Sequence, residues 1–386
     1  MSLLSRRSVL KGGIIAAASA LLPSSSWAIC TPWASWTSFK QSFIANGRVI
    51  DVGSERNHTT SEGQSYALFF ALVANDRATF EQLLQWTTEQ LAQGDLTHNL
   101  PAWWWGKRDD GSMGVLDSNS AADSDLWIAY TLLEAGRLWR ERRYTAVGTL
   151  LAQQIVAQET VPIHGLGRTL LPAPQGFHPE ADVWRLNPSY VPLQVLRRLA
   201  VLAPAGDPTW TQLIESSRRV LLGCAPHGFA PEWIVYRTKE GFQADAETHA
   251  EGSYNAIRVY LWAGMLAPND PAFTPLIAAY RPMVDWIRAH GAPPERIDTV
   301  TVKSVNGNDG PSGFSAAVVP FLAAQRDVAL AQGQALRSEQ LALVSNPGYF
   351  GQVLRLFGLG WYQRRYRFRV DGQLEPAWAT SSCLIG

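Results

Sequence analysis

The sequence predicts an all-α fold in one domain. Apolar residues recur at the spacing of helical turns from one end of the chain to the other. Of its 386 residues, 46% are hydrophobic and 17% charged, a composition typical of a globular protein with a large core. No linker rich in Pro, Gly or Ser divides the chain. Helices in pairs can build a solenoid or a closed ring, and the absence of a fixed sequence period disfavours the solenoid.

The expected helices follow one another in pairs, joined alternately by short and long connections. They are expected at 33–46, 63–74, 77–92, 124–141, 144–157, 188–203, 208–223, 253–266, 271–289, 313–324, 326–342 and 347–359. The long connections are 93–122, 158–187, 224–252 and 290–312, which are rich in Gly, Pro, Trp, Asp and Asn. Such segments usually carry function on a rigid scaffold. The alternation of Tyr366–Val370, followed by Asp371-Gly372, predicts one short β-ribbon.

The first 28 residues predict an export signal. Arg6 and Arg7 resemble a twin-arginine signal, an apolar stretch follows over 12–22, and Ser26-Trp27-Ala28 resembles a cleavage site. That stretch is too short to span a bilayer, and later apolar runs are short and interrupted, so we expect no membrane span. Cleavage near Ala28 would leave residues 29–386 as a single periplasmic or secreted domain.

Charge and cysteine content narrow the possible partners. The chain has 33 basic and 33 acidic residues, a balance that gives no support to nucleic acid as a partner. Export permits disulfides, and a bond between Cys30 and Cys383 would tie the two ends of the mature chain together. Cys224 ends a helix-like apolar run and is expected to be a buried free thiol. No Cys or His pairs have metal-ligand spacing, so no metal site is expected.

Glu62 is the first candidate for chemistry. It can be read as part of a capping box, with Thr59 as N-cap and Glu62 three residues later. The following Gly63 is a poor helix former and would let another group approach the carboxyl closely. A carboxyl flanked by Tyr66 and an apolar helix would have its pKa raised by desolvation, which suits a general acid.

Two further segments place polar residues at expected helix starts. Asp117, Asp123 and Asp125 exceed what one helix terminus uses, although acidic residues there also complement the helix dipole. Asn255 and Arg258 lie three apart amid apolar neighbours, an arrangement that is usually only a satisfied polar patch.

Aromatic residues are unusually frequent, with 16 Trp, 11 Tyr and 14 Phe. The cluster Trp103-Trp104-Trp105 lies in a loop rich in Gly, Pro and Asp, and Trp184 precedes Asn187-Pro188-Ser189-Tyr190 in a similar context. Rings in such loops can stack on the faces of sugars, whereas packing between helices is the alternative for any single ring.

Three motifs in order resemble glycoside hydrolase family 8. They are Thr60–Tyr66, Asp117-Ser118-Asn119-Ser120 leading to Asp123-x-Asp125, and Ser253-Tyr254-x-Ala256–Tyr260. The resemblance covers nearly the whole mature chain and is strongest to the members encoded with bacterial cellulose synthase. It implies an (α/α)6 toroid with a cleft across one end, which hydrolyses internal β-1,4 bonds of glucan with inversion and without a cofactor. It also implies the cellulose synthesis and export machinery as a partner.

The resemblance also implies roles for single residues. Glu62 matches the general acid, and Asp123 matches the acidic residue that holds the sugar at the cleavage site. An inverting mechanism forms no covalent nucleophile, so Asp123 is assigned to substrate distortion and water positioning. The remaining matches would line the cleft and bind the substrate: Tyr66, Trp103, Tyr190, Asn255 and Arg258.

Asn255 departs from the family pattern, because family members carry the general-base Asp at this position. An amide can orient water but cannot accept a proton at neutral pH, and general-base help contributes about 10²–10⁴ in rate. The chain is then a disabled variant, a glucan-binding relative, or an enzyme in which Asp123 or Asp309 acts as base. Xylan and chitosan remain alternative substrates.

Overall fold

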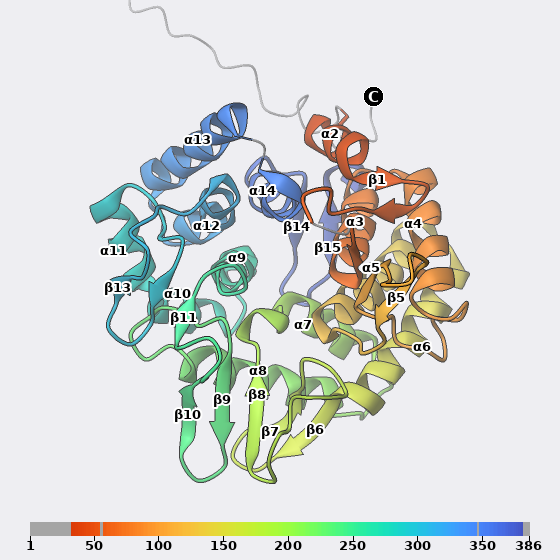
Figure 1. Ribbon diagram of the computed structural model, residues 1–386, viewed down its shortest axis with the longest axis horizontal. Coiled ribbons are helices and arrows are strands. Elements are labelled where there is room, and N and C mark those ends of the chain that lie inside the picture. Colours follow the sequence, from red (N-terminus) through yellow and green to blue (C-terminus); the bar gives the residue numbers. More distant parts are fainter. Residues whose placement is uncertain (1–31, 55–56, 346, 381–386) are drawn as a thin grey trace, which may run out of the picture.

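The computed structural model describes residues 32–54, 57–345 and 347–380, and this part of the chain is mostly helical (Figure 1). The helices are α2 (Ala34–Phe43), α3 (Ser61–Val73), α4 (Arg77–Gln90), α5 (Ala122–Trp139), α6 (Arg142–Glu159), α7 (Leu193–Leu202), α8 (Thr209–Gly223), α9 (Ile257–Met265), α10 (Phe273–Ala279), α11 (Arg281–His290), α12 (Ser312–Ala324), α13 (Val328–Val344) and α14 (Gly348–Tyr362), with 3₁₀ turns η1 (Pro188–Tyr190) and η2 (Ala377–Ala379). None of these helices is both long and apolar enough to cross a membrane.

Two classes of helix alternate along the chain. Helices α3, α5, α9 and α12 are buried on nearly all sides, and every residue of α9 is buried. Helices α4, α6, α8 and α11 each bury one face and expose the other. A helix that is apolar all round must lie inside the protein, and an amphipathic one covers it. The chain runs once around the molecule, and α14 returns to pack against α2 (Figure 1).

Aromatic rings from α3, α5, α9 and α14 meet inside the protein. Trp127 of α5 lies 5.4 Å from Trp262 of α9 and 5.4 Å from Phe357 of α14, measured between ring centroids. Phe69 of α3 stacks on Phe357 at 5.4 Å. Packing between helices therefore accounts for many of the rings that the sequence carries in excess.

Small antiparallel sheets occupy the connections between helices and accompany the mostly helical fold that the sequence predicts. The strands are β1 (Ile44–Ala45), β2 (Arg48–Val49), β3 (Thr59–Thr60), β4 (Trp104–Lys107), β5 (Met113–Asp117), β6 (Thr160–Ile163), β7 (Gly167–Leu170), β8 (Val183–Leu186), β9 (Ile234–Arg237), β10 (Gly241–Ala244), β11 (Glu251–Gly252), β12 (Ile297–Asp298), β13 (Lys303–Ser304), β14 (Tyr366–Phe368) and β15 (Leu374–Pro376). They form the sheets β1-β2, β3-β4-β5, β6-β7, β8-β9-β10, β11-β12-β13 and β14-β15. The last is the predicted ribbon, in which Tyr366 pairs with Pro376.

Proline explains where the predicted helices differ most from those observed. The range 188–203 divides into η1 and α7 because Pro192 pushes the residue before it out of helical geometry. The range 271–289 divides into α10 and α11 near Pro282, which has no N–H to donate to a preceding turn. Cys224 at the end of α8 is buried and free, as predicted. The predicted export signal, Cys30 and Cys383 lie outside the described residues.

Candidate active site

Arg258, in the first turn of α9, connects residues from three buried helices. Its side chain is 2% exposed. Its Nη1, which carries two N–H groups, lies within hydrogen-bond distance of three acceptors: Glu62 Oε2 at 2.6 Å, the Tyr66 hydroxyl at 2.8 Å and Asp123 Oδ2 at 3.0 Å. Its Nη2 donates to Asn255 Oδ1 at 2.6 Å. One buried guanidinium group thus gathers four of the predicted site residues, which lie up to 196 positions apart in the sequence.

The carboxyl group of Glu62 contacts Arg258 and does not cap a helix. Thr60, and not Thr59, is the N-cap of α3, and its hydroxyl accepts the N–H of Gly63. Thr59 lies in β3, so the capping-box interpretation is wrong by one residue. Burial raises the pKa of Glu62 to about 7, and the negative charge of Asp123 adds to this, while Arg258 opposes it. Near neutral pH this carboxyl can hold a proton and release it.

Asp123 lies beside Glu62 on the same nitrogen of Arg258. Its Oδ1 accepts the backbone N–H of Ser124 at 2.7 Å and the Ser124 hydroxyl at 3.2 Å. Burial raises the pKa of Asp123, and Arg258 and Ser124 counteract that effect. Two carboxyl groups that share one guanidinium nitrogen repel each other when both are ionised, which favours a proton on one of them.

Asn255 lies on the other side of Arg258, in the turn that precedes α9. Its Nδ2 donates to Glu232 Oε2 at 2.7 Å, while its Oδ1 accepts from Arg258. A carboxylate requires a donor and a guanidinium requires an acceptor, so these two neighbours define the orientation of the amide. One guanidinium group separates Asn255 from Glu62, because its Nη1 donates to Glu62 and its Nη2 donates to Asn255.

Glu232 is the site residue that the sequence analysis missed. It precedes β9, and its carboxylate accepts the backbone N–H groups of Ser253, Asn255 and Ala256 at 2.8–2.9 Å on Oε1. One feature of the sequence could have indicated Glu232. It is an acidic residue next to Trp233 in the long connection 224–252, and the other candidate loops also combine acidic and aromatic residues.

The predicted aromatic residues divide between the site and the core. Tyr190 of η1 lies with its ring centroid 5.6 Å from Arg258 Cζ. Trp103, whose carbonyl accepts the N–H of Ser61 at the start of α3, is half-buried and stacks on Trp104. Trp105, in contrast, is buried in β4, so the cluster is not a uniform loop surface.

The other two aspartates of the second motif have separate tasks. Asp117 Oδ1 accepts the N–H of Asn119 and shapes the turn before α5. Asp125 is fully buried beside Glu159, and burial followed by the nearby Glu159 carboxyl raises the pKa of Asp125 well above its usual range. Burial raises the pKa of Glu159 to about 8, and its carboxylate accepts the Ser120 hydroxyl. Asp309, the other base that the sequence suggested, faces Arg337 at 3.7 Å.

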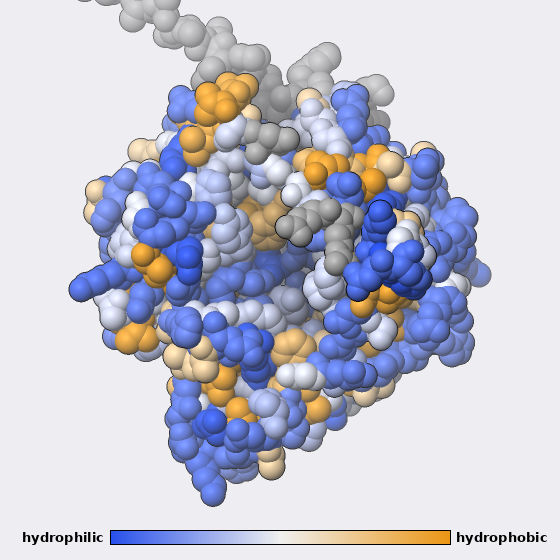
Figure 2. Space-filling view, viewed as in Figure 1, coloured by the Kyte–Doolittle hydropathy of each residue, from blue (hydrophilic) through white to orange (hydrophobic). Residues whose placement is uncertain are grey.

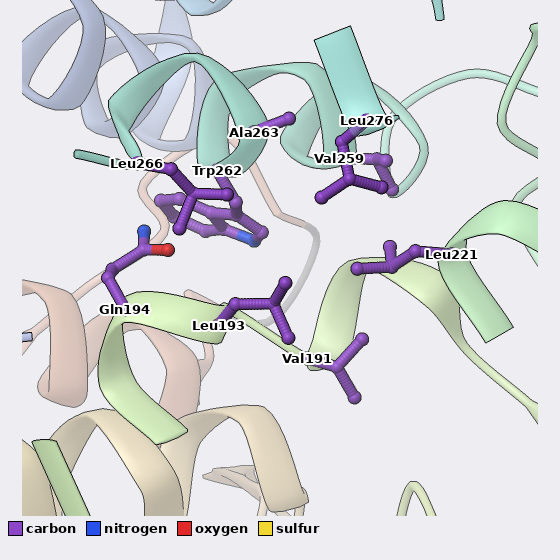
Figure 3. Close-up of a pocket in the computed structure, with 9 residues that line it drawn as sticks. All are labelled: Val191, Leu193, Gln194, Leu221, Val259, Trp262, Ala263, Leu266 and Leu276. Atoms are coloured by element: carbon purple, nitrogen blue, oxygen red, sulfur yellow. The ribbon is translucent and has the colours of Figure 1, made fainter. Parts of the chain in front are cut away.

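The surface is hollowed in the middle of the face shown in Figure 2, and hydrophilic side chains surround the hollow. A separate cavity of about 10 Å³ lies between α7, α8, α9 and α10, lined by apolar residues such as Leu193, Leu221 and Trp262 (Figure 3). It has room for about one water molecule and is too small for a sugar. Within the described ranges, no group of three or more His, Cys, Asp or Glu could hold a metal ion.

Comparison with known proteins identifies the family of the chain. Residues 9–364 match the glycosyl hydrolases family 8. The chain belongs to this family. It is 48% identical over 349 residues to an endoglucanase of Salmonella typhi, covering 90% of this chain and 91% of that one, and 45% identical over 371 residues to an endoglucanase of Escherichia coli K12, covering 96% and 97%. The crystal structure of an endo-1,4-D-glucanase from Vibrio fischeri superposes with a TM-score of 0.86 at 48% identity, covering 90% of this chain and all of that one.

Proposed function

We propose that this glycoside hydrolase is an endo-acting β-1,4-glucanase that cleaves internal bonds of cellulose with inversion. Endoglucanase is the activity named for relatives that are 45–48% identical over at least 90% of this chain. The observation that carries the proposal is the Glu62 carboxyl, whose pKa is raised by burial to about 7. Arg258 holds this carboxyl and also contacts Asp123 and Asn255.

In the proposed reaction, Glu62 gives its proton to the glycosidic oxygen as the bond to the anomeric carbon breaks. Water attacks the opposite face of the sugar, on the side of Asn255. Asp123 holds the sugar ring, and Tyr66, Trp103, Tyr190 and Arg258 line the cleft. Asn255 orients the water but cannot accept its proton, which passes to the surrounding solvent, so the rate is lower by about 10²–10⁴ than with a carboxylate at this position.

The test is the release of reducing ends from carboxymethyl cellulose by the mature protein, beside its Glu62→Gln and Asn255→Asp variants. We expect slow turnover by the unmodified protein, faster turnover by Asn255→Asp and none by Glu62→Gln. Binding of cello-oligosaccharides without cleavage by the unmodified protein and by Asn255→Asp would identify a glucan-binding relative instead. Faster release from xylan or chitosan would reassign the substrate.

The fold and location extend the proposal. The helices are proposed to close into an (α/α)6 toroid, which the return of α14 to α2 and the alternation of buried and covering helices support. The chain is proposed to be exported by its twin-arginine segment and to act beside the cellulose synthesis and export machinery. Sequencing the N-terminus of periplasmic protein checks the export, because cleavage near Ala28 would leave a chain that starts at about Ile29.

A further inference from the structure

We propose that Glu232 is a positioning residue that sets the orientation of the side chain at position 255 and disfavours a second negative charge there. This inference rests on the proposed function, in which that side chain addresses the attacking water. In this proposal Glu232 does not contact the substrate and acts on the reaction only through the Asn255 side chain.

The first support is the completeness of the contacts around Glu232. Its Oε1 accepts three backbone N–H groups from the turn before α9, and its Oε2 accepts the N–H of Asn255 at 3.1 Å and its Nδ2 at 2.7 Å. A carboxylate with this many donors has a defined position, and its last contact holds the Asn255 side chain. The side chain at 255 is therefore directed by a carboxylate on one side and by Arg258 on the other.

The second support is the charge that surrounds position 255. Arg258 is the cation that contacts it, and the same guanidinium is shared with Glu62 and Asp123. The neighbouring cations Arg296 and Arg185 are engaged elsewhere, with Glu251 and with Asp245 and Glu247. On the outer side, Tyr254 donates to Glu295. A second carboxylate at 255 would therefore face Glu232 at hydrogen-bond distance in a region that already has more carboxyl groups than cations.

The neutral Asn255 amide donates to Glu232 and accepts from Arg258 without any change of protonation, whereas an ionised carboxyl at this position has no hydrogen to donate to Glu232. With Asn255→Asp, the carboxyl introduced at position 255 must share a proton with Glu232, because two carboxylates this close cannot both ionise. The attacking water would then meet a negatively charged base only at a pH well above the pKa of an ordinary aspartate. Position 255 and Glu232 thus act as one unit that carries a single negative charge.

A double-mutant cycle of Glu232→Gln and Asn255→Asp tests the inference through kcat and KM on soluble cello-oligosaccharides. Glu232→Gln keeps an acceptor oxygen for the backbone N–H groups but places an amide opposite Asn255, so we expect kcat to fall about tenfold with KM nearly unchanged. In the Asn255→Asp background the same change offers a donor to the carboxylate, so we expect kcat at neutral pH to rise. The acidic limb of the pH–rate profile should move down by about one pH unit or more.

The matched control is Glu240→Gln, at the turn between β9 and β10, which removes a carboxylate that accepts from Gln243 and leaves Asn255 and its neighbouring cations untouched. It should move neither kcat nor the acidic limb. A role of Glu232 in the turn alone would make Glu232→Gln harmful in both backgrounds and would overturn the inference. An acidic limb of Asn255→Asp in the range of an ordinary aspartate would overturn it as well.

A stability measurement separates this inference from the proposed function, because it needs no turnover. A carboxyl with a raised pKa in the folded protein keeps a proton that the unfolded chain releases above about pH 4. Relative to the unmodified protein, Asn255→Asp should therefore lose thermal stability as pH rises from about 4 to 8, and the loss should vanish once Glu232→Gln is added. A pH-independent difference overturns the inference, even if no variant hydrolyses glucan.

Discussion

Glu62 and Glu232 lie on opposite sides of the Arg258–Asn255 pair and have contrasting surroundings. Glu62 is held by Arg258 and enclosed by buried helices, and burial raises its pKa to about 7. Glu232 accepts the backbone N–H groups of Ser253, Asn255 and Ala256 in one turn, and it also accepts from the Asn255 side-chain amide. The difference teaches that a half-buried carboxyl with few donors can exchange a proton, whereas one saturated by backbone donors serves to hold its neighbours.

The largest expected effect is the loss of activity in Glu62→Gln. Gln cannot donate a proton to the glycosidic oxygen, so kcat should fall by about 10²–10⁴. The change is measured as reducing ends released from carboxymethyl cellulose. The exposed Glu89 of α4 provides the control, since Glu89→Gln should leave the rate unchanged. Full activity of Glu62→Gln would show that Glu62 is not the proton donor, and the functional contrast with Glu232 would no longer hold.

Replacing the shared cation should cost the most stability. Arg258→Met leaves the buried Asp123 and the half-buried Glu62 without a counter-charge, so the free energy of unfolding should fall by about 3–5 kcal/mol. Urea unfolding at neutral pH measures it. Arg143→Met breaks an exposed pair with Glu81 and should cost at most about 1 kcal/mol. Equal losses of unfolding free energy in Arg258→Met and Arg143→Met would contradict the conclusion that burial makes the Arg258 ion pairs the more important ones.

The pH dependence of kcat/KM should report the proton on Glu62. The acid must be protonated to act, and burial raises its pKa to about 7, so activity should fall about tenfold for each pH unit above that value. Initial rates on soluble cello-oligosaccharides between about pH 5 and 9 would measure this basic limb. A rate that stays constant across this range would exclude Glu62 as the acid.

The smallest effect concerns the helix start that presents Glu62. Thr60→Ala removes the hydroxyl that accepts the N–H of Gly63, and the free energy of unfolding should fall by about 1 kcal/mol. Thr149→Ala on the exposed side of α6 is the control and should change stability little. If Thr59 were the cap instead, Thr60→Ala would have no effect of this size.

Much of the architecture could be predicted from sequence because it depends on local pattern. The helical periodicity located α3, α5 and α12 within about two residues, and alternation with a turn signal located the ribbon β14-β15. The small sheets in the connections were not predicted. Their strands are two to five residues long, too short for alternation to stand out, and they pair only because neighbouring loops lie side by side.

The sequence by itself determined the family, the helices and the identity of Glu62, Asp123, Asn255 and Arg258 as a set, since motifs and periodicity are properties of short segments. Only the tertiary structure decided that Arg258 contacts all of the other three, that Thr60 rather than Thr59 caps α3, and that Glu232 holds Asn255. The physical reason is distance along the chain. Hydrogen bonds and charges act between atoms that folding brings together, and no local pattern records which distant partner a buried side chain will meet.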